Sequence, residues 1–212
     1  MAEGPSPATH YCPSCGERVF TYSAQVADRD EIRCGYCGLA LEMTESVRPV
    51  PTGCVMVVDD DEFFRNLLAD LLTQEGLAAE VLSFDGGASF LTQLTQRFRQ
   101  EKQVRLAILD IVMSPLDGVA SALALRALER GFDRGAAIPV LFFSAVKATE
   151  ALRKHMARCA PAYYLNKGSD ATPERLAERM RHIFGQIFTW AGSPTPPLIS
   201  DPPSGAPSPA PG

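Results

Sequence analysis

Gly53-Cys-Val-Met-Val-Val-Asp-Asp-Asp61 sets a run of apolar residues between a glycine and three aspartates. A short continuous apolar run is typical of a strand buried on both faces, as in a parallel sheet. Apolar residues then recur at helical spacing from Phe63 to Leu72, and Gly76 follows where a helix should end. The stretch therefore predicts the first strand and the first helix of an α/β domain.

The same alternation of strand and helix signals continues to about Trp190. Further strands are expected at 79–84, 104–109, 138–143 and 162–165, and further helices at 87–98, 119–130, 149–158 and from 172 onward. The last helix opens with Thr172-Pro173, an N-cap residue followed by proline in the first turn. Strands alternating with helices in this way predict an α/β fold, with a five-stranded parallel sheet covered on both faces.

The 212 residues divide into four segments. Residues 10–42 contain two Cys-x2-Cys pairs, Cys12/Cys15 and Cys34/Cys37, a spacing that predicts a small zinc ribbon. We assign 43–52 to a linker, 53–190 to the α/β domain and 191–212 to a disordered tail. The tail is made almost entirely of proline, serine, glycine and alanine. Such a composition cannot offset the conformational entropy lost on ordering.

Composition and charge exclude several classes of protein. The net charge is −5 and the pI is near 5.3, which argues against a dedicated nucleic-acid binder because phosphate contacts need a basic surface. No stretch approaches the roughly 18–20 apolar residues of a membrane span, and no secretory signal opens the chain. We therefore expect a cytoplasmic protein without membrane insertion, whose six cysteines are reduced rather than disulfide-bonded.

Polar residues follow the expected strands at one edge of the sheet. Asp59 and Asp60 follow the first strand, Asp110 the third, Ser144 the fourth, and Lys167 the fifth. The carboxyl ends of parallel strands form the ligand-binding edge of such sheets. Clustered carboxylates repel one another without a cation, and an all-oxygen ligand set with open positions suits Mg²⁺.

This edge has the groups that phosphoryl transfer requires. A carboxylate can act as a nucleophile and form an aspartyl-phosphate, while Lys167 supplies a compact positive charge and Ser144 a hydroxyl donor. Each residue taken alone is more simply a solvated turn, a helix cap or a surface side chain. Their occurrence together, each at the correct strand end, favours a functional pocket.

Residues 53–190 resemble the receiver domain of bacterial response regulators. The motifs that carry the resemblance are Val-Met-Val-Val-Asp59-Asp60, Leu-Ala-Ile-Leu-Asp110 with Met113 and Leu-Asp117-Gly118 after it, Leu-Phe-Phe-Ser144-Ala145, and Tyr164-Leu-Asn-Lys167. The resemblance implies a five-stranded flavodoxin-like sandwich. It implies that Asp110 is the phosphoacceptor and that Asp59, Asp60, Asp110 and the backbone carbonyl of Val112 bind Mg²⁺. It further implies that Ser144 is the switch hydroxyl, Tyr164 the switch aromatic residue and Lys167 the phosphate-contacting lysine.

The same resemblance implies a histidine kinase or phosphotransfer protein as phosphodonor. Output would pass to a downstream protein through the face formed by the fourth helix, fifth strand and fifth helix of the receiver, or through the ribbon. The domain would catalyse only its own phosphotransfer and autodephosphorylation, so we do not expect an enzyme. Three departures from the family pattern are Met113-Ser114-Pro115, where the usual proline is shifted by one residue, Gly168, where proline is usual, and the apolar Val112, which offers no polar side chain to hydrolytic water.

Cys12-Pro-Ser-Cys15 and Cys34-Gly-Tyr-Cys37 form two Cys-x2-Cys pairs in the N-terminal segment. This spacing predicts a structural Zn²⁺ site with four thiolate ligands, whereas redox thiols or incidental cysteines are the alternatives. A glycine follows each pair, as expected for a tight turn whose N–H groups face the sulfurs. Short strands are expected at 17–22 and 30–33.

The charge of the N-terminal segment bears on the partner of the ribbon. Residues 1–50 hold four arginines and no lysine against seven acidic residues, a net charge of −3, which favours a protein contact over nucleic acid. Two alternatives stay open: a phosphorylation-independent adaptor with a receiver fold, and a nucleic-acid-binding regulator acting through the ribbon. Of the other cysteines, we expect Cys54 to be a small buried hydrophobe and Cys159 to be partly exposed.

Overall fold

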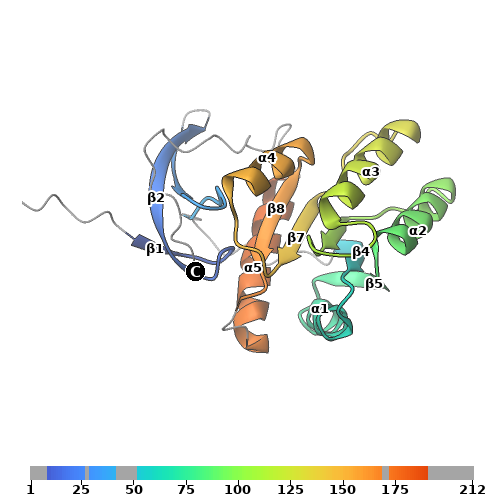
Figure 1. The fold of residues 1–212 in the computed structure, drawn as a ribbon, viewed down its shortest axis with the longest axis horizontal. Helices are drawn as coiled ribbons and strands as arrows, with labels where there is room; N and C mark the ends of the chain where they lie inside the picture. The colour runs from blue at the N-terminus through green and yellow to red at the C-terminus, as the bar shows by residue number, and fades with distance from the viewer. Residues whose placement is uncertain (1–8, 27–28, 42–51, 169–171, 191–212) are drawn as a thin grey trace, which may run out of the picture.

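The computed structural model describes residues 9–26, 29–41, 52–168 and 172–190. These residues form two sheets, a three-stranded antiparallel sheet near the N-terminus and a five-stranded sheet after it (Figure 1). The linker predicted at 43–52 lies outside the described residues except for Thr52, which already belongs to a strand. The tail predicted at 191–212 lies wholly outside them.

The larger sheet has the order β5-β4-β6-β7-β8 and every neighbouring pair is parallel. Its strands are β4 (Thr52–Val58), β5 (Ala78–Phe84), β6 (Leu106–Leu109), β7 (Val140–Ser144) and β8 (Ala162–Asn166). The middle strands β4, β6 and β7 are almost fully buried, as their unbroken apolar sequences require. The predicted five-stranded parallel α/β fold is confirmed.

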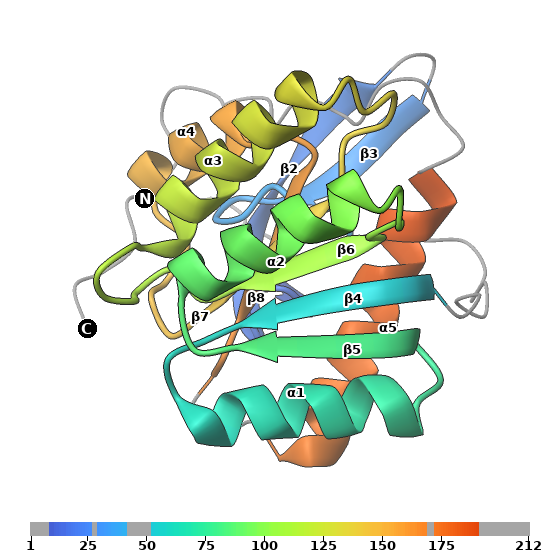
Figure 2. The same cartoon turned by 90° about the vertical axis from the view of Figure 1, so that its right-hand side faces the viewer.

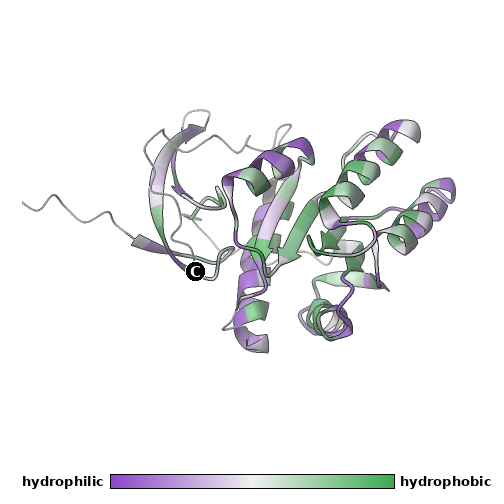
Figure 3. Ribbon diagram, viewed as in Figure 1, coloured by the Kyte–Doolittle hydropathy of each residue, from purple (hydrophilic) through white to green (hydrophobic). Residues whose placement is uncertain are grey.

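Five helices cover this sheet: α1 (Glu62–Gln74), α2 (Gly87–Arg99), α3 (Gly118–Gly131), α4 (Glu150–Arg158) and α5 (Pro173–Trp190). In Figure 2, α1 and α5 lie on one face, and α2, α3 and α4 lie on the other. The apolar strands run through the middle of the domain and the polar sides of the helices face outward (Figure 3). No helix in the described part of the chain has the length and apolar character required to cross a membrane.

Two strands begin two residues later than expected, β6 at Leu106 and β7 at Val140, the second of them after a proline. The fourth strand of the sheet begins at Val140 rather than at 138. Pro139 has no N–H to donate, although its carbonyl still accepts a hydrogen bond from the Ala107 N–H at 3.0 Å. The C-terminal strand ends, which matter for the site, lie within a residue of those predicted.

The ribbon contains β1 (Thr9–Cys12), β2 (Glu17–Val26) and β3 (Arg29–Cys34), paired antiparallel in that order. Two shorter strands were expected, and β1 was missed because its four residues are too few to show an alternating pattern. This small sheet lies beside α4, β8 and α5, on the side away from α2 and α3 (Figures 1 and 2). The two parts of the chain are therefore in direct contact.

Candidate functional site

Three carboxylates meet at the carboxyl edge of the large sheet. Asp59 follows β4 and Asp110 follows its parallel neighbour β6, where the Asp110 N–H donates to the Val58 carbonyl at 2.8 Å. Asp59, Asp60 and Asp110 offer oxygen atoms that all lie within 4.8 Å of one another. Asp59 and Asp110 are buried, whereas Asp60 is exposed at the rim. The sheet register thus creates an acidic pocket that is open on one side.

Lys167 enters this pocket from the end of β8. Its Nζ lies 2.7 Å from Asp59 Oδ2 and 2.9 Å from Asp110 Oδ2. The same Nζ lies 4.3 Å from the centre of the Phe64 ring and 5.6 Å from that of Phe143. A cation over an aromatic face is attracted by its negative π surface, and more so where water is excluded. Lys167 is therefore held between two carboxylates and two rings.

The electrostatics of the pocket favour a cation. Burial raises the pKa of Asp59 above its usual value, although the adjacent Lys167 ammonium acts in the opposite direction. Asp59 Oδ2 is buried and, among the described residues, accepts no hydrogen bond of good geometry despite its ion pair with Lys167. One lysine does not neutralise three carboxylates. These oxygen donors fit Mg²⁺, which binds through one or two carboxylates and keeps several water ligands.

Ser144 and Tyr164 lie behind the pocket. Ser144 ends β7, is buried, and accepts a long 3.5 Å hydrogen bond from the Val146 N–H. The Tyr164 ring is buried, and its hydroxyl donates to the Val146 carbonyl at 2.5 Å and accepts from Asn166 Nδ2 at 2.7 Å. The ring therefore already occupies an inward position in this structure.

Val112 and Asp61, which neighbour the carboxylates in the chain, make different contacts. Val112 is 61% exposed, and its N–H donates to Asp110 Oδ1 at 3.3 Å. Asp61, the third aspartate of the opening motif, caps α1 by accepting from the Phe63 N–H at 2.8 Å. Of the three consecutive aspartates, two therefore belong to the pocket and one to the helix end.

The four ribbon cysteines form a second cluster. Their sulfurs all lie within 4.8 Å of one another, with Cys12 Sγ 3.6 Å from Cys37 Sγ and Cys15 Sγ 3.8 Å from Cys34 Sγ. Four sulfurs at about 2.3 Å from a tetrahedral Zn²⁺ would be ~3.8 Å apart. The spacing of the cluster therefore fits a closed four-thiolate metal site.

The backbone around these cysteines is also arranged for thiolates. The Cys15 N–H points at Cys12 Sγ at 3.4 Å, and the Tyr36 and Cys37 N–H groups point at Cys34 Sγ at 3.3 and 3.4 Å. Each pair closes with a glycine in the left-handed region, Gly16 at φ 76° and Gly38 at φ 77°, which only glycine adopts at little cost. Burial raises the pKa of the Cys12 thiol, and a bound metal would favour its thiolate form.

All six cysteines lie in the described segments and are free thiols. Cys54 is buried at the start of β4, as expected. The expectation of a partly exposed Cys159 is wrong, because this residue is fully buried. Its carbonyl accepts from the Arg126 guanidinium at 2.9 and 3.0 Å, which draws the end of α4 against α3.

Sequence reasoning missed several residues that shape these sites. Phe64 was assigned only to an apolar stripe, and Asn166 was passed over between two motif residues. Arg179 and Gln186 are buried on α5, among the residues of its apolar stripe. A charged or amide side chain within such a stripe was the signal that could have found them, since buried polar groups need partners.

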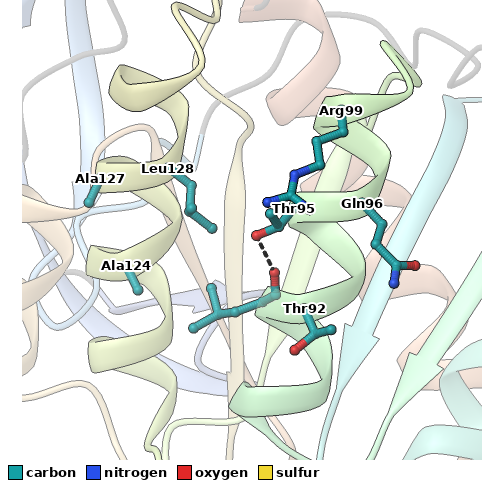
Figure 4. A pocket seen from close by; sticks show the side chains of 8 residues that line it. Thr92, Thr95, Gln96, Arg99, Ala124, Ala127 and Leu128 are labelled. Carbon is teal, nitrogen blue, oxygen red and sulfur yellow. Dashed lines mark hydrogen bonds between the residues drawn. The ribbon is translucent and has the colours of Figure 1, made fainter.

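A separate groove of about 630 Å³ lies between α2 and α3 (Figure 4). Its lining combines Leu91, Ala124, Ala127 and Leu128 with polar side chains of α2. The Thr95 hydroxyl donates back to the Leu91 carbonyl at 2.8 Å, so it is not directed toward a ligand. None of the predicted site residues lines this groove.

Comparisons with known proteins agree with this architecture. The receiver domain of the histidine kinase CKI1 from Arabidopsis thaliana, in complex with Mg²⁺ and BeF₃⁻, is 19% identical, with a TM-score of 0.52 over 64% of this chain and 89% of that one. The Mg²⁺ complex of the same receiver is 22% identical, with a TM-score of 0.51 over 64% and 94%. The receiver of NarL from Mycobacterium tuberculosis is 24% identical, with a TM-score of 0.49 over 63% and 97%.

No curated protein matches the chain. Likeness at these low identities establishes the fold alone. The family model described as the response regulator receiver domain, however, matches residues 55–181, more than half of the chain. By sequence as well as by fold, this chain belongs to the response regulator receiver domain family.

Proposed function

We propose that the chain is a response regulator that accepts a phosphoryl group on Asp110 and signals through altered protein contacts. The observation that carries the proposal is the cluster of Asp59, Asp60 and Asp110 within 4.8 Å, with the buried Lys167 touching two of them. A purely structural ion pair would not require three carboxylates and an open rim.

In the proposed reaction a carboxylate oxygen of Asp110 attacks the phosphorus of a phosphohistidine on a histidine kinase or phosphotransfer protein. A P–O bond forms, the P–N bond breaks, and the imidazole leaves. Lys167 then exchanges its contact with Asp110 for the phosphoryl oxygens, and the Ser144 hydroxyl donates to another of them. The domain acts only on itself, so we do not propose turnover of a separate substrate.

Asp59, Asp60, Asp110 and the Val112 carbonyl would hold Mg²⁺. When bound, this ion neutralises charge on the carboxylates and the phosphoryl oxygens. The CKI1 receiver is a protein of the same fold whose structure contains Mg²⁺ and BeF₃⁻, which supports this assignment. Because the exposed Val112 side chain has no polar group to orient a water molecule, we also propose slow autodephosphorylation.

For the ribbon, we propose a structural Zn²⁺ bound by Cys12, Cys15, Cys34 and Cys37. The sulfur spacing and the N–H groups directed at the sulfurs support it. Four ligands leave no open position for catalysis. Because a four-thiolate site needs reduced cysteines, we further propose a cytoplasmic location.

The deciding experiment is incubation of the full chain with acetyl phosphate and Mg²⁺, followed by intact mass measurement. We expect the wild type to gain one phosphoryl group and Asp110→Asn to gain none. Asp70→Asn, which changes an exposed carboxylate on α1, is the matched control and should behave as wild type.

Failure of the wild type to gain a phosphoryl group, while a partner protein still binds, would favour a phosphorylation-independent adaptor. Salt-dependent binding of nucleic acid by the full chain would favour the nucleic-acid-binding alternative. The acidic ribbon argues against that second outcome, because phosphate contacts need clustered Lys and Arg.

A further inference from the structure

The ribbon contacts β8 through hydrogen bonds to backbone groups of the strand. β8 is an edge strand of the large sheet, and an edge strand leaves backbone groups unpaired along its outer side. In this chain Ser14, which lies between Cys12 and Cys15, pairs with two of these groups. The Asn166 N–H donates to the Ser14 carbonyl at 2.8 Å, and the Ser14 hydroxyl donates to the Tyr164 carbonyl. The metal-binding loop Cys12–Cys15 thus covers the end of β8.

Arg179 of α5 holds the same loop. Its Nε donates to the Pro13 carbonyl at 2.6 Å, and its Nη2 donates to the carbonyls of Ser14 at 3.1 Å and Asn166 at 2.8 Å. A Cβ on Gly16 would lie 3.1 Å from the guanidinium carbon, so the loop and the arginine are in close contact. One buried side chain therefore joins the first cysteine pair to the strand that leads into the pocket.

A second arginine, on α4, holds the other pair. Arg153 Nη1 donates to the carbonyls of Gly35 at 2.7 Å and Tyr36 at 3.1 Å, both inside the loop Cys34–Cys37. Gln186 of α5 adds a hydrogen bond to the Ala40 carbonyl at 2.8 Å. Arg179 and Arg153 thus bind the backbone carbonyls of both cysteine loops. The directions of these carbonyls depend on the loops keeping their metal-binding shape.

The buried positive charge of Arg179 also favours a metal-loaded ribbon. Arg179 is only 6% exposed, and within the described part of the chain no carboxylate lies within ion-pair distance of its guanidinium. A divalent cation with four thiolates carries a net charge of −2 and would offset this buried positive charge, whereas four neutral thiols would not.

The ribbon contact leads directly to the phosphoacceptor pocket. Asn166, which the first loop holds, precedes Lys167 in the chain. Its Nδ2 donates to the Tyr164 hydroxyl and to the Ser144 carbonyl at 3.2 Å, and its Oδ1 accepts from the Gly168 N–H at 2.8 Å. The residue that carries the ribbon contact therefore also orders the backbone on both sides of Lys167.

We propose that the metal-loaded ribbon is the receiver's own ligand for the α4–β8–α5 face, and that its docking holds Lys167 in the pocket. While the metal is bound, this face is closed to other proteins, and partners meet the outer side of the ribbon instead. Loss of the metal releases the loops from Arg179 and Arg153 and exposes the β8 edge. The effect on the pocket rests on the proposed phosphoacceptor function, whereas the docking itself does not.

Docking is tested by residue-resolved amide exchange on the full chain. The amide of Asn166 is the probe, because its hydrogen bond is made to the ribbon. We expect its exchange to accelerate by about tenfold or more when the metal is removed with a chelator under reducing conditions. Arg179→Gln and Arg153→Gln should have the same effect with the metal still bound, as verified by native mass spectrometry.

Two matched controls change exposed arginines on the same helices, Arg175→Gln on α5 and Arg158→Gln on α4. Both should exchange as wild type. If Arg179→Gln fails to fold, the less buried Arg153→Gln decides the result. Unchanged protection of Asn166 in the metal-free chain and in Arg153→Gln would overturn the docking proposal.

Coupling to the pocket is tested with beryllofluoride and Mg²⁺ as a phosphoryl mimic. The zinc-loaded chain should bind it at least ~5-fold more tightly than chain whose zinc was stripped and whose chelator was then removed. Arg179→Gln should lose most of that difference. Equal affinities in the two metal states would overturn the coupling. Absence of binding in both would overturn the proposed phosphoacceptor function, and the Asn166 exchange result would still decide docking.

Discussion

At the scale of single residues, Lys167 shows what sequence could and could not supply. The sequence placed it near Asp110, because both follow strands that end at one edge of a parallel sheet. It did not indicate that Phe64 and Phe143 would lie over the ammonium group, since an aromatic residue in an apolar stripe is usually core. A contact between side chains of α1, β7 and β8 depends on packing, which periodicity does not describe.

Asp59→Asn tests the electrostatic character of the pocket. Burial raises the pKa of Asp59 although the adjacent Lys167 ammonium opposes this shift, so the ionised form remains a cost to the folded state until a further cation such as Mg²⁺ binds. In Mg²⁺-free buffer we expect the variant to melt at a higher temperature than wild type at neutral pH. Addition of Mg²⁺ should stabilise wild type, by about 2.7 kcal/mol at a hundredfold excess over Kd, and leave the variant nearly unchanged.

The pH dependence follows from the same raised pKa. A carboxyl group with a higher pKa in the folded state binds its proton more readily there, so its stabilising contribution is present at low pH and is lost as pH rises through the folded pKa. The advantage of the variant should therefore persist near neutral pH and shrink as pH falls through the folded pKa toward the unfolded value. A variant less stable than wild type at neutral pH without Mg²⁺ would contradict this account.

At the scale of elements, the turn between β6 and α3 is fixed by close backbone contact. Gly118, the first residue of α3, packs on the backbone of Asp110: a Cβ there would lie 1.9 Å from the Asp110 carbonyl oxygen. Its N–H also donates to the Ile111 carbonyl at 3.1 Å, which closes the loop. The motif Leu-Asp117-Gly118 drew attention to this glycine, but its tight contact depends on the path of the loop.

Gly118→Ala should consequently lower the free energy of unfolding by at least about 2 kcal/mol, because the backbone of Asp110 must move to admit the methyl group. Urea denaturation measures the change. Gly131→Ala, at the other end of α3, is the matched control, since a Cβ there meets nothing within 4 Å. That change should be neutral or stabilising by up to about 1 kcal/mol. Equal stabilities of the two variants would contradict the proposed close contact.

Helix α3 is also joined to the segments that precede β7 and β8 through a buried ion pair. Arg126 and Glu129 lie 2.7 Å apart, and between them they bond both the N–H and the carbonyl of Ile138. Sequence reasoning assigned both residues only to the helix expected at 119–130 and gave them no partner. Polar residues on a helix identify its outer face only when no neighbouring loop covers them, and the segment before β7 covers these.

At the scale of the whole molecule, the ribbon and the receiver were expected to be separate modules joined by a linker. The structure instead places the ribbon on the α4–β8–α5 face, which sequence reasoning had named as one of two alternative output surfaces. The α4–β8–α5 face and the ribbon are therefore not independent output surfaces, because the ribbon covers that face. Stability should then be shared between the two parts of the chain.

Calorimetry of the full chain tests this sharing. With zinc bound we expect a single unfolding transition. After removal of zinc the receiver transition should remain but fall by at least ~2–4 °C, the shift that about 1 kcal/mol produces in a chain of this size. Cys34→Ser should resemble the zinc-free protein and should not respond to added zinc. A receiver transition that is independent of zinc would contradict shared stability.

The sequence by itself determined the α/β class, the order of its strands and helices, and the candidate phosphoacceptor and four-cysteine residues. These depend on local patterns: apolar runs for buried strands, helical spacing for amphipathic helices, and short fixed spacings for metal ligands. Only the tertiary structure decided that Arg179 and Arg153 hold the cysteine loops and that Lys167 lies between carboxylates and rings. The arginine contacts join residues more than a hundred positions apart and follow from the docking of one sheet against the edge of another. The Lys167 contacts follow from the packing of α1 against neighbouring strands within the larger sheet.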